Sequence, residues 1–124
     1  MKTPSAFTIL HLRFQLRVHP ELLLAQSREA AFHIASADGL IWKIWVLQPE
    51  KLTMGGIYLF AGRDTAEAYL SHPVIQAIRS NPAVVSSESQ LWEIESSLSA
   101  LTRAPLPDLS SPHADLPASV AGGR

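Results

Sequence analysis

Cysteine is absent from the 124 residues of this chain. Its absence excludes disulfide bonds, thiolate nucleophiles and iron–sulfur clusters held by cysteine. A chain without cysteine is compatible with a reducing compartment, and we expect a cytoplasmic protein. A long apolar run is also lacking, since none approaches the roughly 20 residues that span a bilayer. His11 and Arg13 interrupt the apolar stretch near the N-terminus, so we expect no signal peptide and no membrane partner.

The chain also lacks an excess of either charge, because its formal net charge is -1 and its pI is about 6.5. Such a balance does not favour binding to nucleic acid, and we expect no nucleic-acid partner. The motifs G-x-G-x-x-G, G-x-x-x-x-G-K-[S/T] and G-x-S-x-G are missing, which leaves dinucleotide, P-loop and hydrolase functions without support. The five histidines show neither H-x-H nor H-x-x-x-H spacing, so we expect no metal site.

The composition, with 47% hydrophobic and 17% charged residues, is typical of one compact globular domain. It changes near residue 104, where four prolines follow within "APLPDLSSPHADLPASVAGGR". That segment has neither a helical nor a strand period. We therefore predict a folded domain over residues 6–103 and a flexible Pro/Ser/Gly-rich tail over residues 104–124.

Hydrophobic periodicity within the domain predicts four strands and two helical segments. "FTILHLRFQL" alternates as a strand does, and Pro20 is typical of the first turn of a helix. "LIWKIWVL" is rich in β-branched and aromatic residues and is closed by Pro49. The expected strands are residues 7–16, 40–47, 56–61 and 86–95, and the expected helical segments are residues 20–36 and 63–81, the latter restarting at Pro73. The order β-α-β-β-α-β predicts an α+β, ferredoxin-like fold with helices on one face of a four-stranded antiparallel sheet.

Each strand of such a sheet has one face toward the helices and one face away from them. The residues expected to face the helices are Leu10, Leu12, Phe14, Trp42, Ile44, Ile57 and Leu59. The residues expected on the opposite face are Ile9, His11, Arg13, Ile41, Lys43, Trp45, Tyr58 and Phe60. This second set is too apolar to remain in water as one patch, so we expect two sheets to face each other in a homodimer and to enclose a pocket.

Several stretches together resemble a known family. They are "LHLRF", "GLIWKIW", "GGIYLF", "AEAYL" and "LWEIESSLS", and the resemblance as a whole covers residues 8–102. In this order and spacing they resemble the YdhR-type mono-oxygenases of the dimeric α+β barrel superfamily. The restart of the second helical segment at Pro73 departs from the family pattern. The resemblance implies oxygenation by O₂ without metal or flavin, on the anion of an electron-rich phenol or hydroquinone.

The resemblance implies a site with a proton-transferring group, cations for an oxyanion and an aromatic wall. His11 is the candidate for proton transfer, Arg13 and Lys43 for the oxyanion, and Tyr58 for a hydrogen bond to the substrate. Ile9, Trp45 and Phe60 are the candidate pocket wall. Each candidate has a structural alternative. His11 and Arg13 are equally compatible with a dimer seam in which they pair with Glu93 or Glu95. Lys43 is equally compatible with a cation that reaches solvent along a tryptophan.

The leading hypothesis is a cofactor-independent mono-oxygenase that acts, as a homodimer, on a small aromatic or polycyclic phenolic compound. One alternative is a non-catalytic ligand-binding or stress-protective module with the same cavity. Another is an isomerase or cyclase that needs no O₂. Haem, which is bound elsewhere in the superfamily, would require an axial histidine such as His33 or His72, both predicted on helices. We expect no cofactor.

Overall fold

The computed structural model describes residues 7–107, which fall into two units. The first unit ends at Ile94 and the second begins at Glu95. The second unit contains one short helix, α5 (Ser96–Leu101), whose first turn is capped by the Glu95 carboxylate through a 2.8 Å hydrogen bond from the Leu98 N–H. Residues 104–107 are neither helix nor strand, and the rest of the predicted tail lies outside the described residues.

A four-stranded antiparallel sheet organises the first unit. Its strands are β1 (Thr8–Leu16), β2 (Leu40–Gln48), β3 (Thr53–Phe60) and β4 (Val84–Glu93). Their order in the sheet is β2-β3-β1-β4, so the first strand lies inside, between β3 and β4. With helical connections after β1 and β3, this is the predicted ferredoxin-like arrangement, which is confirmed.

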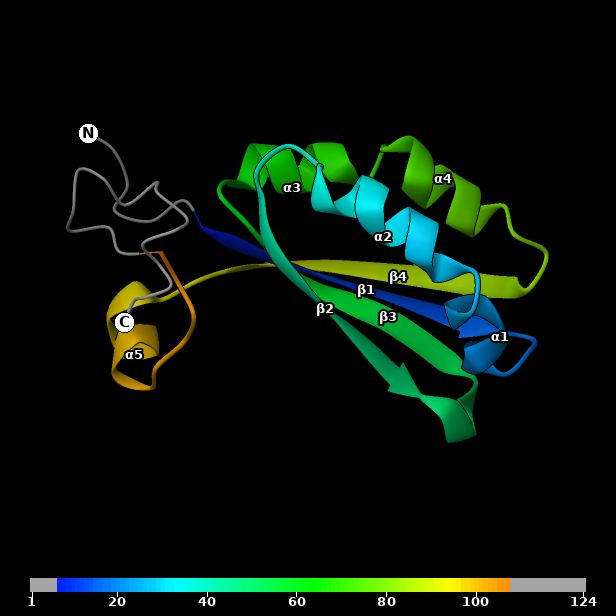
Figure 1. The fold of residues 1–124 in the computed structure, drawn as a ribbon. Helices are drawn as coiled ribbons and strands as arrows, with labels where there is room; N and C mark the ends of the chain where they lie inside the picture. Colours follow the sequence, from blue (N-terminus) through cyan, green and yellow to red (C-terminus); the bar gives the residue numbers. More distant parts are fainter. Residues whose placement is uncertain (1–6, 108–124) are drawn as a thin grey trace. The chain divides into compact units, whose positions relative to one another are not determined.

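The helices of the first unit cover one face of this sheet, as Figure 1 shows for α2, α3 and α4. Their bounds are α1 (Pro20–Leu24), α2 (Ser27–Ala35), α3 (Arg63–Tyr69) and α4 (Pro73–Arg79), with a 3₁₀ turn η1 (Pro49–Lys51) between β2 and β3. None of the helices within residues 7–107 is long and apolar enough to cross a membrane.

Both predicted helical segments are divided in two. The first breaks after Leu24, where the Ser27 hydroxyl donates a 2.8 Å hydrogen bond to the Leu23 carbonyl, four residues back. That bond pattern bends helices. The second breaks at His72, and α4 restarts at Pro73 as the sequence predicted. The His72 ring caps α4, because Nδ1 accepts a 3.0 Å hydrogen bond from the Val74 N–H. A histidine before a proline thus has a capping role here.

The core lies between the sheet and the helices, and β1 has the predicted phase. Leu10, Leu12 and Phe14 are at most 5% exposed and belong to one cluster with residues of α2, α3 and α4. The alternating residues His11 and Arg13 lie on the other face and are partly or fully exposed. The alternation of β1 therefore identified both faces correctly.

For β3 the predicted phase is wrong. Tyr58 is paired with Leu10 across the sheet, and residues directly opposite each other share a face. Tyr58 and Phe60 are therefore on the helix side, where both are at most 1% exposed. Ile57 and Leu59 lie on the face away from the helices. The run "GIYLF" is apolar at every position after the glycine, so alternation alone could not determine its phase.

For β2 the predicted phase is also wrong, because the strand contains a bulge. Leu40 is paired with Phe60 and Trp42 with the next residue, Leu59, so Ile41 has no partner of its own. An extra residue exchanges the two faces of the strand beyond it. Lys43 and Trp45 consequently lie on the helix side. Trp42 and Ile44, which were predicted to face the helices, lie on the open face of the sheet.

Candidate active site

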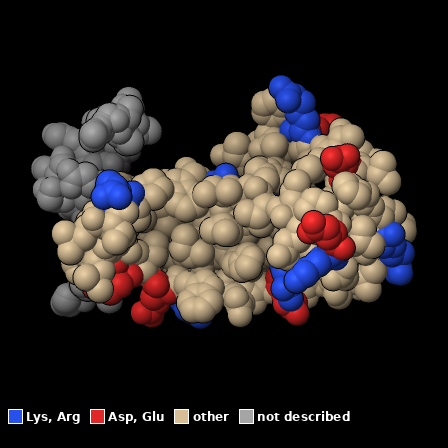
Figure 2. Space-filling model, turned by 90° about the horizontal axis from the view of Figure 1, so that it is seen from below, with Lys and Arg blue, Asp and Glu red and all other residues tan. Residues whose placement is uncertain are grey.

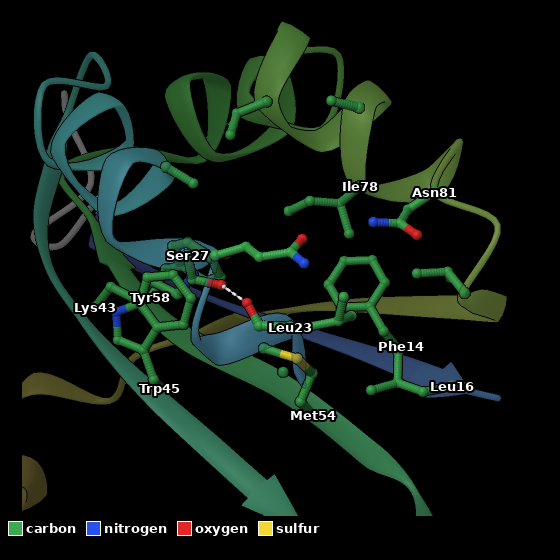
Figure 3. A pocket seen from close by; sticks show the side chains of 16 residues that line it. Phe14, Leu16, Leu23, Ser27, Lys43, Trp45, Met54, Tyr58, Ile78 and Asn81 are labelled. Carbon is green, nitrogen blue, oxygen red and sulfur yellow. Dashed lines mark hydrogen bonds between the residues drawn. The ribbon is translucent and has the colours of Figure 1, made fainter. Parts of the chain in front are cut away.

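A pocket of about 200 Å³ lies between the sheet and the helices of the first unit. Figure 3 shows side chains from β1, β2 and β3 pointing toward α2 and α4 around this space. Most of the lining is apolar, including Phe14, Leu16, Trp45, Met54, Val74 and Ile78. Small-molecule sites have such apolar walls with a few polar groups that fix orientation.

Lys43 is the one charged side chain among the residues that line this pocket. Its ammonium nitrogen, Nζ, lies 3.4 Å from the centroid of the Trp45 ring and 4.7 Å from that of the Tyr58 ring. Within residues 7–107, neither of the two salt bridges involves Lys43. Burial lowers the pKa of Lys43 from 10.5 to about 7, although the two ring faces favour the charged form. The pocket thus contains an amine that exchanges its proton near neutral pH.

Glycines in β3 make room for this arrangement. A Cβ at Gly56 would lie 2.6 Å from Lys43 Cε and 2.9 Å from Tyr58 Cε1, too close for either side chain to keep its position. A Cβ at Gly55 would collide with the Leu12 carbonyl oxygen. Both glycines sit in regular register with β1 and β2. Because these glycines have no side chain, the neighbouring backbone and the Lys43 and Tyr58 side chains can approach β3 closely.

Tyr58 connects the pocket to a buried aromatic cluster. Its ring lies 5.1 Å from that of Tyr69 and 6.0 Å from that of Phe60, centroid to centroid. The Tyr69 hydroxyl donates a long, 3.5 Å hydrogen bond to the Tyr58 hydroxyl oxygen. Burial, with smaller contributions from Tyr69, raises the pKa of Tyr58, and burial raises that of Tyr69 too. Tyr58 therefore stays protonated at neutral pH and keeps its own O–H to donate to a ligand.

Neutral polar side chains complete the lining. The Asn81 carbonyl oxygen accepts a 2.8 Å hydrogen bond from the Ala83 N–H, which orients its amide at the end of α4. Gln26, in the turn between α1 and α2, and Ser27, the first residue of α2, also line the pocket. No carboxylate is among the lining residues. The site therefore combines one amine, one phenol and two amides within apolar and aromatic walls.

The predicted site residues do not all come together. Lys43, Trp45 and Tyr58 line the pocket, but on the helix side of the sheet, whereas the prediction placed them on the open face. Phe60 is packed behind Tyr58 and is not among the lining residues.

Ile9, His11 and Arg13 lie on the open face, on the opposite side of the sheet from the pocket. Within the chain, Arg13 forms a 2.6 Å ion pair with Glu88. The pairing of His11 and Arg13 with Glu93 or Glu95 at a dimer seam stays a prediction. The catalytic roles predicted for His11 and Arg13 stay predictions.

Sequence reasoning missed the part of the wall that the helical connections supply. Ile78 and Asn81 belong to the connection between β3 and β4, and Leu23 and Ser27 to that between β1 and β2. The sequence shows the helical period of these segments, but it does not show how close they lie to the strands. Phe14 was already predicted to face the helices, and Met54, which pairs with it, follows once the phase of β3 is known.

A second cavity, of about 230 Å³, lies at the other end of the helical layer. Its lining includes Asp38, Thr65, Tyr69 and His72. The His72 ring lies 5.6 Å from the Tyr69 ring, centroid to centroid, and its Nδ1 is engaged in capping α4. His33, the other histidine considered for haem, is exposed on α2. Among residues 7–107 no group of three or more histidine, aspartate or glutamate side chains could hold a metal ion.

Comparison with known proteins gave one family match. Residues 9–105 match the model of the family described as "Putative mono-oxygenase ydhR". No curated protein matches the chain.

Several solved structures share the fold at low identity. The cofactor-independent oxygenase SnoaB from Streptomyces nogalater, in a mutant form, is 16% identical with a TM-score of 0.59, covering 76% of this chain and 98% of that one. The haem degrader MhuD from Mycobacterium tuberculosis, with two haems in its active site, is 12% identical with a TM-score of 0.57. The match covers 71% of this chain and 95% of MhuD. A dimeric ferredoxin-like protein from Thermobifida fusca is 14% identical with a TM-score of 0.56, covering 76% and 96%.

Proposed function

This chain belongs to the ydhR mono-oxygenase family, and from that premise we propose that it oxidises a small phenolic compound with O₂ in the pocket between sheet and helices. The observation that carries the proposal is the position of Lys43. Its amine is the one ionisable group with a near-neutral pKa in an apolar, aromatic space. A cofactor-independent oxygenase, SnoaB, shares the fold, which supports the same reaction type here.

The first step is removal of the phenolic proton. A general base works best when its pKa is near the operating pH, and Lys43 at about 7 meets that condition. Proton transfer leaves an ammonium beside a phenolate, and in a space with few polar groups that pair is strongly stabilised. The Tyr58 hydroxyl donates a hydrogen bond, and the Trp45 ring provides a stacking surface.

The second step is reaction of the phenolate with O₂. One electron passes from the ring to O₂, and the two radicals then join through a new C–O bond at a ring carbon that carries hydrogen. The terminal peroxide oxygen takes the proton back from the Lys43 ammonium, and loss of water from the resulting hydroperoxide leaves a carbonyl group at that carbon. The substrate loses two hydrogens and gains one oxygen, while the other oxygen atom leaves as water. The substrate supplies all the electrons, so the balance requires neither a metal nor a flavin.

The size of the pocket restricts the substrate. A cavity of roughly 150 Å³ with apolar walls binds benzene in another protein. At about 200 Å³, this pocket fits a compound of one or two rings. Of the phenolic compounds considered from the sequence, naphthols and substituted phenols therefore fit better than tricyclic ones. Haem, which MhuD binds, is much larger than this space.

The proton-transferring role is assigned to Lys43 in place of His11 because of the side of the sheet on which each lies. His11 is paired with Ile57 and Gln90 on the open face, and the sheet backbone separates it from the pocket. A variant at each position decides between the two assignments.

A homodimer is part of the proposal. The open face carries apolar side chains from all four strands, and Ile44 and Trp92 are 51% and 56% exposed. Figure 2 looks onto this face, where uncharged residues make up most of the surface. A second copy of the chain would bury these side chains. The dimeric ferredoxin-like protein from Thermobifida fusca supports this assembly.

The test is O₂ uptake by metal-stripped protein with a panel of naphthols, hydroquinones and anthrones. We expect uptake without added cofactor that rises with pH through about 7, as Lys43 loses its proton. Lys43→Met should lower kcat/KM by about 100- to 10,000-fold, the usual contribution of a general base. Lys51→Met, at an exposed lysine in η1, is the matched control and should leave the rate unchanged.

The same assays with the substrate panel also distinguish the proposed function from its alternatives. Loss of uptake in His11→Ala with normal uptake in Lys43→Met would return the base role to His11. Binding without uptake would indicate a ligand-binding module, and loss of substrate without uptake would indicate an isomerase or cyclase.

A further inference from the structure

Lys43 has a second chemical possibility, because an unprotonated amine attacks carbonyl carbons as well as accepting protons. Three features of its surroundings favour that reaction. No carboxylate among the pocket-lining residues holds the ammonium form. Lys43 Cε packs directly against Gly56, where any Cβ would lie only 2.6 Å from it, so the glycine lets the amine lie at this place in the pocket. The aromatic rings of Trp45 and Tyr58 flank Nζ at 3.4 and 4.7 Å.

We propose that Lys43 Nζ condenses with a small aromatic aldehyde bound in this pocket and forms an imine. This activity goes beyond the oxygenation proposed above and does not depend on it, since it needs no O₂. Lysines that are desolvated in apolar pockets are the ones that form Schiff bases with carbonyl compounds.

The reaction balances without any further reagent. The lone pair of Nζ attacks the aldehyde carbon, forming a C–N bond while the carbonyl oxygen takes a proton from the nitrogen. The resulting hydroxyl leaves as water with the second proton of the amine. One aldehyde and one amine thus give one imine and one water, with no change of oxidation state. The mostly apolar lining favours the uncharged imine and its aromatic body inside the pocket.

The pocket walls indicate which aldehydes fit. The rings of Phe14 and Trp45 and the thioether of Met54 suit a flat aromatic body, and about 200 Å³ accommodates one or two rings. The amides of Gln26 and Asn81 are available to a hydroxyl substituent at the far end of the ligand. Hydroxybenzaldehydes and hydroxynaphthaldehydes have this chemistry.

Selectivity for Lys43 over other lysines follows from its proton affinity. Burial lowers the pKa of Lys43 to about 7, so a large fraction of its amine is unprotonated at neutral pH. A lysine in water has a pKa of about 10.4 and is almost entirely protonated there. A less basic amine is also a weaker nucleophile, which offsets part of this difference.

The experiment is reductive trapping at pH 7 under argon. The full-length protein is incubated with 4-hydroxybenzaldehyde and sodium cyanoborohydride, which reduces an imine to a stable secondary amine. Intact-mass measurement counts the adducts, and peptide mapping locates them. We expect one adduct at Lys43, formed at least about tenfold faster than any adduct at the exposed Lys51, because a lysine in water has a more than hundredfold smaller unprotonated fraction. Lys51→Met should not change the yield.

Two variants keep the result decisive. Lys43→Arg retains the positive charge and removes the nucleophile, so the fast adduct should disappear. Ala30→Leu adds volume to a residue of the pocket wall and leaves Lys43 intact, so trapping should slow at least tenfold. Modification spread evenly over the lysines, confined to the N-terminal amine, or unaffected by Ala30→Leu would overturn the proposal.

Discussion

The two faces of the sheet provide opposite environments for the cations that they carry. On the open face, Arg13 is half exposed and paired with Glu88 at 2.6 Å. On the helix face, Lys43 is largely buried, lies against two aromatic rings and has no ion pair within the described residues. The charge of Arg13 is therefore compensated by a carboxylate and by water. Lys43 has no carboxylate partner among the described residues and burial reduces its hydration, so its pKa falls.

This difference indicates where chemistry can occur in the molecule. A solvated ion pair is chemically inert, because both partners keep their ordinary charges over the physiological pH range. A desolvated amine has its proton equilibrium near neutral pH and is available as a base or a nucleophile. The helix face therefore carries the proposed activity, and the open face carries the proposed assembly.

The largest expected effect is the loss of folding stability when a buried side chain on the helix face is shortened. Leu12 is fully buried in the core cluster, so Leu12→Ala should lower the free energy of unfolding by about 2–5 kcal/mol. Gln90→Ala, at an exposed position of β4 opposite His11 on the open face, should change it by less than about 0.5 kcal/mol. Urea denaturation measures both. Losses of similar size would mean that the two faces are assigned the wrong way round.

A charged substitution on the open face should weaken dimerisation. Ile44→Asp places a charge within the proposed dimer interface and should weaken dimerisation by at least about 30-fold, the effect of losing an energetically important interface residue. Phe32→Asp replaces an exposed apolar residue of α2, 69% exposed on the helical layer, and should leave the oligomeric state unchanged. Analytical ultracentrifugation compares the two. A dimer that survives Ile44→Asp and dissociates with Phe32→Asp would place the interface on the helices.

The buried cation should make stability depend on pH. The folded-state pKa of Lys43, about 7, is below its ordinary value of 10.5, so the unfolded chain binds more protons between these two values. The contribution of Lys43 to stability should therefore rise with pH from about 7 to 10.5 and should be least favourable below 7. Lys43→Met should raise the free energy of unfolding at pH 6 by on the order of 1 kcal/mol or more, since one pKa unit corresponds to about 1.4 kcal/mol.

Denaturation at pH 6 and pH 9 tests this dependence. The advantage of Lys43→Met over the native chain should shrink at the higher pH, while Lys51→Met should show no such trend. An advantage that grows with pH would contradict the assigned direction of the pKa shift.

The smallest expected effect is at the exposed ion pair. The Arg13 and Glu88 side chains are 52% and 67% exposed, and pairs of this kind contribute between 0 and about 1 kcal/mol. Arg13→Ala should therefore change stability by less than about 1 kcal/mol, and salt should reduce the change further. A loss above about 2 kcal/mol in thermal or chemical denaturation would mean that the open face is less solvated than its exposure indicates.

The sequence was sufficient for the topology because that topology depends on local signals. Alternation in β1, the prolines at positions 20 and 73, and the Asp38-Gly39 turn each mark an element or its end. Gly39 has the positive φ of 78° that such a turn requires. The phases of β2 and β3 depend on a bulge at Ile41 and on pairing with Leu10, and neither is visible in a single strand's sequence.

The site was predictable only in part for the same reason. Lys43, Trp45 and Tyr58 were recognised as an unusual combination within strands, and they do lie together around one pocket. The prediction placed them on the wrong side of the sheet and therefore grouped His11 and Arg13 with them. Asn81 could not have been found, because its position against the pocket depends on how α4 packs on the sheet.

The measurement that tests this account most directly is the titration of Lys43 itself. Lysine labelled with ¹³C at Cε reports each side chain's protonation by NMR, and the Lys43→Met spectrum assigns the signal. The account predicts a midpoint near pH 7 for Lys43, far below the value of about 10.4 for a lysine in water. A midpoint for Lys43 near 10.5 would contradict it, because the pocket would then contain an ordinary solvated cation with no special reactivity.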